Sequence, residues 1–303
     1  MNVIPPIDIT TALLTSSTAA EPGPGETAWN AATSYSVGQR AIRSTTHRVY
    51  QALTPGGVDA GLPEDTPTRW LDVGPTNRFA MFDLERNSAT VVTSPLTVVI
   101  TPGQRVNAIA LIGVVAQSVT ITMTVGASTV YTYTEDLTTR STLGLYDYFF
   151  GTFGTSPTVI RFDLPPYTGG VITVTLTSAS GNVQCGALAL GTAVYLGKVQ
   201  ANPRSDALNF SRIERDDFGN TTLVPRRSVP KTNQVLLTDK SRIDKLGELR
   251  KALNAVPAVW SGLDDMTTDG YFESLLVLGI YKQFAFDLSH PQHAVVTLEL
   301  EEI

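Results

Sequence analysis

The sequence is poor in the features that mark several common protein classes. Its 303 residues include one cysteine, Cys185, which excludes an internal disulfide framework and fits folding in a reducing compartment. No apolar run approaches the roughly 18 residues that a membrane-spanning helix needs. The start of the chain, MNVIPPIDITTALL, lacks the basic segment of a signal peptide. A net charge of −6 leaves no basic field for phosphates, which argues against nucleic-acid binding.

Charged residues are scarce, at 17% of the chain, and they are unevenly placed. Residues 76–203 carry 12 charged side chains among 128 residues, whereas residues 204–303 carry 27 among 100. A charge-poor segment rich in Thr, Ser and Val either buries both faces of its strands or presents a mildly polar surface to other subunits. This distribution is typical of a component of an assembly.

Residues that carry catalytic chemistry are also few. The chain has three histidines and no Gly-x-Ser-x-Gly elbow, so a nucleophilic triad is poorly supported. His290 and His293 could share a metal ion, but no cysteine or acidic cluster lies beside them in the sequence, and a turn between two strands explains them better. Cys185 lies in an apolar strand pattern, where a thiol is usually inert. The sequence therefore predicts no enzyme, no cofactor and no metal site.

Short runs with period-two alternation dominate residues 76–203. In one of them Val119, Ile121 and Met123 alternate with threonines, and Pro-Gly and Gly-Asn pairs separate the runs. Many short antiparallel strands with such turns predict a β-sandwich or jelly roll. An aromatic run at 143–154 is predicted to be a loop or an edge strand. Its rings could form an interface patch, but core packing is favoured for most of them: Tyr146, Tyr148, Phe149, Phe150 and Phe153.

Residues 204–303 predict an α+β domain. A hairpin with exposed charges is expected over 211–227, and a final hairpin joins 274–288 to 294–303. One helix is predicted over 241–254, with Ser241 as its N-cap and a helical stripe of apolar residues at Ile243, Leu246, Leu249 and Leu253. One helix on an antiparallel sheet completes the domain.

Residues 1–27 read as an arm followed by a linker rich in Pro, Gly and Glu. The apolar residues of the arm either dock on a sheet, in this chain or a neighbour, or belong to a disordered terminus, and the sequence leaves both open. The predicted organisation is therefore an arm and linker (1–27), a small aromatic β module (28–75), an antiparallel jelly-roll-like β-sandwich (76–203) and a C-terminal α+β domain with one main helix (204–303). The protein is predicted to be mainly β.

The small module contains two of the three tryptophans. Trp29, Tyr35 and Gly38, followed by Val49 to Ala52, Pro63 and Trp70, have a spacing that resembles the chitin-binding-type carbohydrate modules of families 5 and 12. The resemblance covers about 45 residues and implies that flat rings stack on sugar faces. The alternative is that the rings are the core of a module with little else to pack, and this alternative is favoured. The candidate carbohydrate-binding residues are Trp29, Tyr35, Tyr50 and Trp70.

Looser phrases along the rest of the chain resemble tail-tip and baseplate proteins of tailed bacteriophages. They lie at 76–83, 211–219, 224–231 and 279–284. The resemblance implies a structural virion protein, made in the host cytoplasm and assembled into the tail in symmetric copies. Its implied partners are other tail or baseplate proteins and copies of itself, with host-surface polysaccharide as a further partner in host attachment.

Two other functions stay open at this point. A carbohydrate-binding adhesin would use the same four aromatic residues for its main task. A polysaccharide hydrolase would need two carboxylates as acid and base, for which the loop offers Asp59, Glu64 and Asp65. Short loops rarely hold two carboxylates at the required separation, so the hydrolase is the least favoured of the three.

Overall fold

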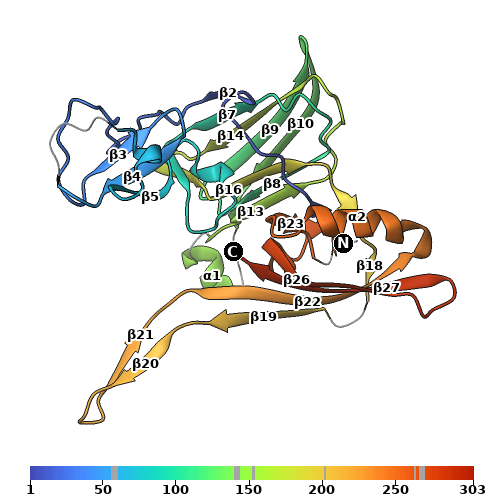
Figure 1. Cartoon of the computed structure of the whole chain (residues 1–303). Coiled ribbons are helices and arrows are strands. Elements are labelled where there is room, and N and C mark those ends of the chain that lie inside the picture. The colour runs from blue at the N-terminus through green and yellow to red at the C-terminus, as the bar shows by residue number, and fades with distance from the viewer. Residues whose placement is uncertain (56–60, 140–143, 152–153, 201–202, 263, 266–269) are drawn as a thin grey trace. The chain divides into compact units, whose positions relative to one another are not determined.

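The computed structural model describes residues 1–55, 61–139, 144–151, 154–200, 203–262, 264–265 and 270–303. The chain divides into two compact units. The amino-terminal unit is Asp8–Leu188, and the carboxyl-terminal unit combines Ala189–Ile303 with Met1–Ile7. Both are built from antiparallel sheets, and the main helix lies near the C-terminus (Figure 1), so the predicted fold class is confirmed. Among the described residues, no helix combines the length and the apolar character that crossing a membrane requires.

The small module is a three-stranded antiparallel sheet in the amino-terminal unit. Its strand order is β3-β4-β5. The register pairs Tyr50 of the central strand with Ala41 on one side and Asp72 on the other. The elements are β3 (Arg40–Arg43), β4 (Arg48–Ala52), the 3₁₀ turn η1 (Pro63–Asp65) and β5 (Trp70–Pro75).

The sandwich occupies the rest of this unit. A five-stranded sheet has the order β10-β9-β14-β7-β2, and a three-stranded sheet has the order β13-β8-β16. The strands of the first sheet are β2 (Leu14–Ser17), β7 (Leu96–Ile100), β9 (Ser118–Val125), β10 (Ser128–Asp136) and β14 (Gly170–Thr177). Those of the second are β8 (Ala108–Ile112), β13 (Thr158–Arg161) and β16 (Ala187–Gly191). Shorter elements complete the unit: η2 (Ala80–Phe82), β6 (Thr90–Thr93), β11 (Thr138–Thr139), α1 (Leu145–Phe150), β12 (Gly154–Thr155) and β15 (Asn182–Cys185).

The alternation predicted for the sandwich is visible in its burial. Val119, Ile121 and Met123 of β9 are fully buried, whereas the threonines between them are not. The outer face carries hydrogen bonds between hydroxyl groups of neighbouring strands, such as Thr120 to Thr134 (3.3 Å) and Thr97 to Thr175 (3.3 Å). Every residue of β8 is buried. The charge-poor composition is therefore explained by one sheet face in the core and one covered by paired hydroxyls.

The prediction for the aromatic run at 143–154 is wrong. The structure has a short helix there, α1, and it buries none of its residues. Leu145, Tyr146 and Phe150 are all more than 70% exposed, and Tyr148 and Phe149 are exposed as well. Five of the six residues of this helix are apolar and exposed, so it has no buried face in the described part of the chain. Phe153 lies outside the described residues.

The carboxyl-terminal unit is built on an eight-stranded sheet with the order β17-β1-β23-β26-β27-β22-β18, in which β19 also pairs with β22. The long strands β22 (Ser228–Asp239), β26 (Val277–Asp287) and β27 (His293–Glu302) form its centre, and the predicted final hairpin is the pair β26-β27. Its shorter strands include β17 (Val194–Tyr195), β18 (Lys198–Val199), β19 (Arg204–Asn209) and β23 (Ala258–Trp260). Two separate two-stranded sheets pair β20 (Arg212–Arg215) with β21 (Thr221–Val224) and β24 (Asp264–Asp265) with β25 (Gly270–Tyr271), and the 3₁₀ turn η4 is Glu273–Leu275.

The amino-terminal arm is ordered by pairing. Its first residues form β1 (Asn2–Ile4), which lies between β17 and β23 and closes a gap in the sheet of the carboxyl-terminal unit. Val3 and Ile4 are completely buried there. The second part of the arm, β2, pairs with β7 at the edge of the sandwich. Of the two possibilities that the sequence left open, docking on this chain is the one that the structure shows.

The predicted helix is present with a different beginning. A 3₁₀ turn, η3 (Lys240–Arg242), leads directly into α2 (Ile243–Ala252). The capping side chain is Asp239, which accepts a hydrogen bond from the Ser241 amide at 3.0 Å, so Ser241 is not the cap. Leu246 and Leu253 are buried against Trp260 and Phe284 of the sheet, as the helical spacing predicts.

Candidate functional site

The four aromatic residues proposed for sugar binding lie in one cluster. Tyr35, Tyr50 and Trp70 are at most 6% exposed and form the core of the small module with two alanines. The Tyr35 ring meets the Trp70 ring edge-on, with centroids 5.0 Å apart. The Tyr35 hydroxyl accepts a hydrogen bond from the Asn30 amide at 2.8 Å, which places the polar end of the ring in the fold as well. These three rings therefore do what core residues of a small module do.

Trp29 is the member of this cluster that is only half-buried. Its backbone is fixed by a hydrogen bond from its amide to the Ile42 carbonyl at 2.9 Å. The Arg43 guanidinium lies 5.1 Å from the centre of its ring, in the position of a cation–π contact. The structure thus brings all four predicted residues together, and Trp29 is the one whose ring reaches the surface. Sugar binding by the cluster stays a prediction.

Of the carboxylates proposed for a hydrolase, Glu64 is engaged by a cationic side chain, and Asp65 follows it in the 3₁₀ turn η1. Glu64 is held by the Arg43 guanidinium at 2.9 Å. Burial raises the pKa of Glu64 and the Arg43 hydrogen bond lowers it, with a net pKa below the ordinary value. A general acid needs the opposite direction, because it must hold its proton near neutral pH. Asp59 lies outside the described residues.

A two-stranded ribbon is the most exposed part of the carboxyl-terminal unit. Strands β20 and β21 form the hairpin that the sequence predicted, and they extend beyond the sheet of their own unit (Figure 1). All residues of β19 and β20 are exposed, and so is nearly all of β21. The ribbon nevertheless carries large apolar side chains on its surface: Ile213, Phe218 and Leu223. Leu208 of β19 and Phe210, which follows β19, are exposed as well.

The apolar residues of the ribbon lie on one face of the hairpin and at its turn. Ile213 lies directly opposite Leu223 in the register, so their side chains share one face of the hairpin. Phe218 sits at the turn and is 91% exposed. The turn itself is well formed, because the Asp216 carboxylate accepts hydrogen bonds from the amides of Phe218 and Asn220 at 3.0 and 2.7 Å. The ribbon is therefore a defined structure that presents apolar groups to solvent.

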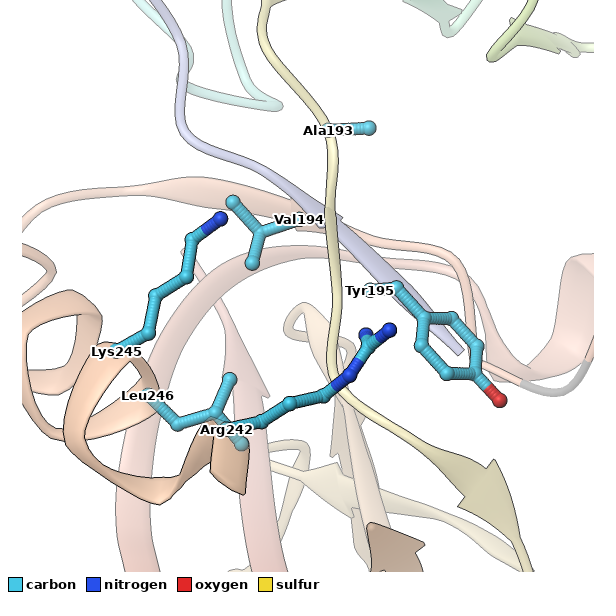
Figure 2. A pocket seen from close by; sticks show the side chains of 6 residues that line it. All are labelled: Ala193, Val194, Tyr195, Arg242, Lys245 and Leu246. Carbon is cyan, nitrogen blue, oxygen red and sulfur yellow. The ribbon is translucent and has the colours of Figure 1, made fainter. Parts of the chain in front are cut away.

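A cavity of about 330 Å³ lies beside α2 in the same unit. Figure 2 shows its lining, with Arg242 and Lys245 from the helical side facing the strand that contains Tyr195. The Arg242 guanidinium lies 5.3 Å from the centre of the Tyr195 ring. Among the described residues that line it, two side chains are cationic and none is acidic, so the cavity favours an anionic group over a cation.

The two neighbouring histidines and the cysteine considered in the sequence analysis have surroundings that favour a structural role. His290 and His293 stack on each other, with ring centroids 5.5 Å apart, in the turn between β26 and β27. Within the described ranges, no group of three His, Cys, Asp or Glu side chains is arranged to hold a metal ion. Cys185 is buried in β15, and burial raises the pKa of its thiol to about 12. Such a thiol is protonated at neutral pH and is a poor nucleophile.

Comparison with protein-family models, with curated protein sequences and with solved structures finds no match for this chain.

Proposed function

We propose that this protein is a structural subunit that assembles with copies of itself, and that the ribbon formed by β20 and β21 is its assembly arm. The carrying observation is the exposed apolar surface of this ribbon, with Phe218 almost completely in solvent. An isolated two-stranded hairpin is only marginally stable in water, so a ribbon of this kind gains most when a neighbour covers it. The occupant we propose for its apolar face is a second copy of this chain.

Docking of the ribbon would bury several large apolar side chains, which favours association. Complete burial of one large apolar side chain contributes about 1.5–3 kcal/mol. The exposed residues Ile213, Phe218 and Leu223 lie close together on one hairpin, so a single contact would bury them jointly. Clustered aromatic and aliphatic anchors are typical of interface hot spots. Symmetric copies are the simplest assembly, because one arm and one receiving surface on every chain are sufficient.

The place of this assembly is proposed to be the tail tip or baseplate of a tailed bacteriophage. The support is the resemblance of the segments at 76–83, 211–219, 224–231 and 279–284 to proteins of that group. One of these segments, 211–219, contains β20 and the turn of the ribbon. The protein would then reside in the virion after synthesis in the host cytoplasm, with other baseplate proteins as further partners.

The assembly is tested by changing the ribbon without changing its strands. The variant Ile213→Thr/Phe218→Ser/Leu223→Thr removes the apolar surface and keeps residues with strand propensity in the two strands. Light scattering of the wild-type chain should report a mass above that of the monomer, and this variant should be monomeric. The matched control is Leu288→Ser/Val256→Thr, which changes exposed apolar residues elsewhere in the same unit and should keep the wild-type mass. A wild-type chain that stays monomeric at high concentration would overturn the proposal.

A second proposed function, glycan binding, has one observation in its favour. Trp29 keeps part of its ring at the surface next to the guanidinium of Arg43, which could donate hydrogen bonds to sugar hydroxyls. If the module binds host-surface polysaccharide, Trp29→Ala should abolish binding on a glycan array and leave the fold intact. Val37→Ala, an exposed change in the same module, is the control and should bind as the wild type does. Equal glycan signals for the wild type and Trp29→Ala would exclude this role.

A further inference from the structure

Three residues of the amino-terminal unit form a continuous hydrogen-bonded chain. The Thr11 hydroxyl oxygen lies 2.5 Å from Nε2 of His47. Nδ1 of the same ring lies 2.8 and 3.0 Å from the two carboxylate oxygens of Glu21. Because a carboxylate accepts hydrogen bonds, the neutral form of this ring carries its proton on Nδ1 and accepts at Nε2 from the Thr11 hydroxyl. This is the tautomer and the order of groups found in hydrolases with a hydroxyl nucleophile, a base and an orienting carboxylate.

Glu21 and His47 are both held in place by contacts with neighbouring side chains. The Glu21 side chain is 5% exposed, and one of its oxygens accepts a hydrogen bond from the Thr76 hydroxyl at 2.6 Å. The Phe79 ring stacks on His47 with centroids 3.7 Å apart. The backbone of His47 has a φ of 54°, in the left-handed region that residues other than glycine rarely adopt. Strained positions of this kind cluster at functional sites, where surrounding contacts impose them.

The Thr11 end of these three hydrogen-bonded residues opens into a cavity of about 260 Å³. Thr11 and His47 both line it, and Thr11 is exposed, so a ligand can reach the hydroxyl. Ile9, Phe79 and Phe82 provide an apolar wall. The volume lies below that of pockets for drug-sized molecules, which begin near 300 Å³, and the cavity is open to solvent, so a small acyl group can enter it.

The lining also includes three charged side chains, Asp8, Arg48 and Asp83. Arg48 lies beside His47 in the sequence, and its Nε donates to Asp72 at 2.9 Å. The Asp83 carboxylate accepts a hydrogen bond from the Ser88 hydroxyl at 2.6 Å. Burial raises the pKa of this carboxyl above the ordinary value. A titratable group perturbed by burial, next to a nucleophile and base in one cavity, is the pattern of a functional site.

We propose that Thr11, His47 and Glu21 hydrolyse carboxylic esters of small acyl groups, an activity independent of the assembly role. His47 Nε2 takes the hydroxyl proton while the Thr11 oxygen attacks the ester carbonyl carbon. The bond to the leaving oxygen then breaks, and His47 returns the proton to the departing alcohol. Water attacks the acyl-threonine with His47 again as base, which releases the carboxylic acid and restores Thr11. One water is consumed for each ester, and no other co-reactant is needed.

The test measures hydrolysis of 4-nitrophenyl acetate by the full chain. The wild type should turn over above the buffer rate, and Thr11→Val should reduce kcat/KM to that rate. Thr11→Ser should retain activity, because it keeps the hydroxyl. Glu21→Gln keeps His47 but removes the carboxylate, and a loss of about 10⁴-fold in kcat is expected by analogy with other triads. Thr33→Val, the same change at an exposed threonine outside the cavity, is the control and should match the wild type.

A second measurement needs no variant. The wild-type chain is treated with a fluorophosphonate probe, and the modified peptide is identified by mass spectrometry. An adduct on Thr11 is the expected result, because the probe reports only activated hydroxyl groups. A wild type with no turnover, a Thr11→Val variant with the wild-type rate, or a labelled chain without an adduct on Thr11 would each overturn the proposal. In those cases the hydrogen-bonded chain serves only to tie residues 8–21 to the small module.

Discussion

The small aromatic module and the ribbon are both small β structures with large apolar side chains, but the module buries these side chains and the ribbon exposes them. In the module, Tyr50 and Trp70 are at most 5% exposed. In the ribbon, Phe218 is 91% exposed and Ile213 is more than half exposed. The module has three strands and the loops around Trp29 and Tyr35 to fold over them, whereas the ribbon has two strands. Burial is thus decided by whether the chain supplies a second layer, and not by residue type.

The comparison has a functional consequence. Aromatic residues that already fill a core gain nothing more from a partner, whereas those left in solvent gain their full transfer free energy on docking. The module is therefore largely satisfied by its own chain, and the ribbon is not. The predictions at Trp70 and Phe218 each change one side of this contrast, and the prediction at Cys185 tests burial in the sandwich. All three measure the free energy of unfolding or of local opening.

The largest effect is expected at Trp70. Trp70→Ala removes the largest side chain of the module core and should lower its stability by about 3–5 kcal/mol, because the cavity cannot collapse completely. Hydrogen exchange of the β3, β4 and β5 amides in the full chain measures this loss locally. Trp70→Phe keeps much of the volume and should cost less than half as much. Unchanged protection in Trp70→Ala would mean that the ring is not part of the core.

A smaller effect is expected from the buried thiol of Cys185, whose pKa is raised to about 12. A raised pKa means that the unfolded chain loses the thiol proton first, so this contribution is complete below pH 9 and declines as pH rises toward 12. Relative to Cys185→Ala, the unfolding free energy of the wild type should therefore fall by about 1 kcal/mol from pH 9 to pH 10, because half of the unfolded thiols are already ionised at pH 9. Urea unfolding of both chains at the two pH values measures the difference. Parallel pH profiles would contradict the burial of the thiol.

The smallest effect on folding is expected at Phe218. Phe218→Ser at the exposed turn should change the unfolding free energy of the monomer by no more than about 0.5 kcal/mol, because the ring has no packing to lose. The same change should weaken self-association, which urea unfolding at low and high protein concentration separates from folding. A loss of several kcal/mol at low concentration would show that the ring packs on its own chain.

Much of the fold was predictable because strand alternation is a local signal. The β9 pattern, the hairpin β26-β27 and the buried stripe of α2 all follow from periodicity that the sequence shows directly. The helix cap was misplaced by two residues, because a 3₁₀ turn after Asp239 has the same composition as a helix start. The helix α1 was missed because a six-residue apolar segment shows no period that distinguishes strand from helix.

The sites were less predictable because they depend on distant contacts. The clustering of Trp29, Tyr35, Tyr50 and Trp70 followed from their spacing in one module, but their burial depended on how the loops close. Thr11 and His47 are separated by 36 residues, and no motif marks them as partners. His47 has few acidic neighbours in the sequence, so nothing indicated that the linker would place the Glu21 carboxylate beside its ring. The exposure of the ribbon has the same origin, since a hairpin pattern does not state what covers it.

The most direct test of the proposed role in the virion is immunogold electron microscopy of tailed phage particles whose genome encodes this chain, both intact and partly disassembled. The antibody is raised against the purified protein, and its epitopes are first verified on the free chain. The account predicts gold confined to the tail tip or baseplate. Unlabelled particles in both preparations, with the same antibody binding the free protein, would contradict it.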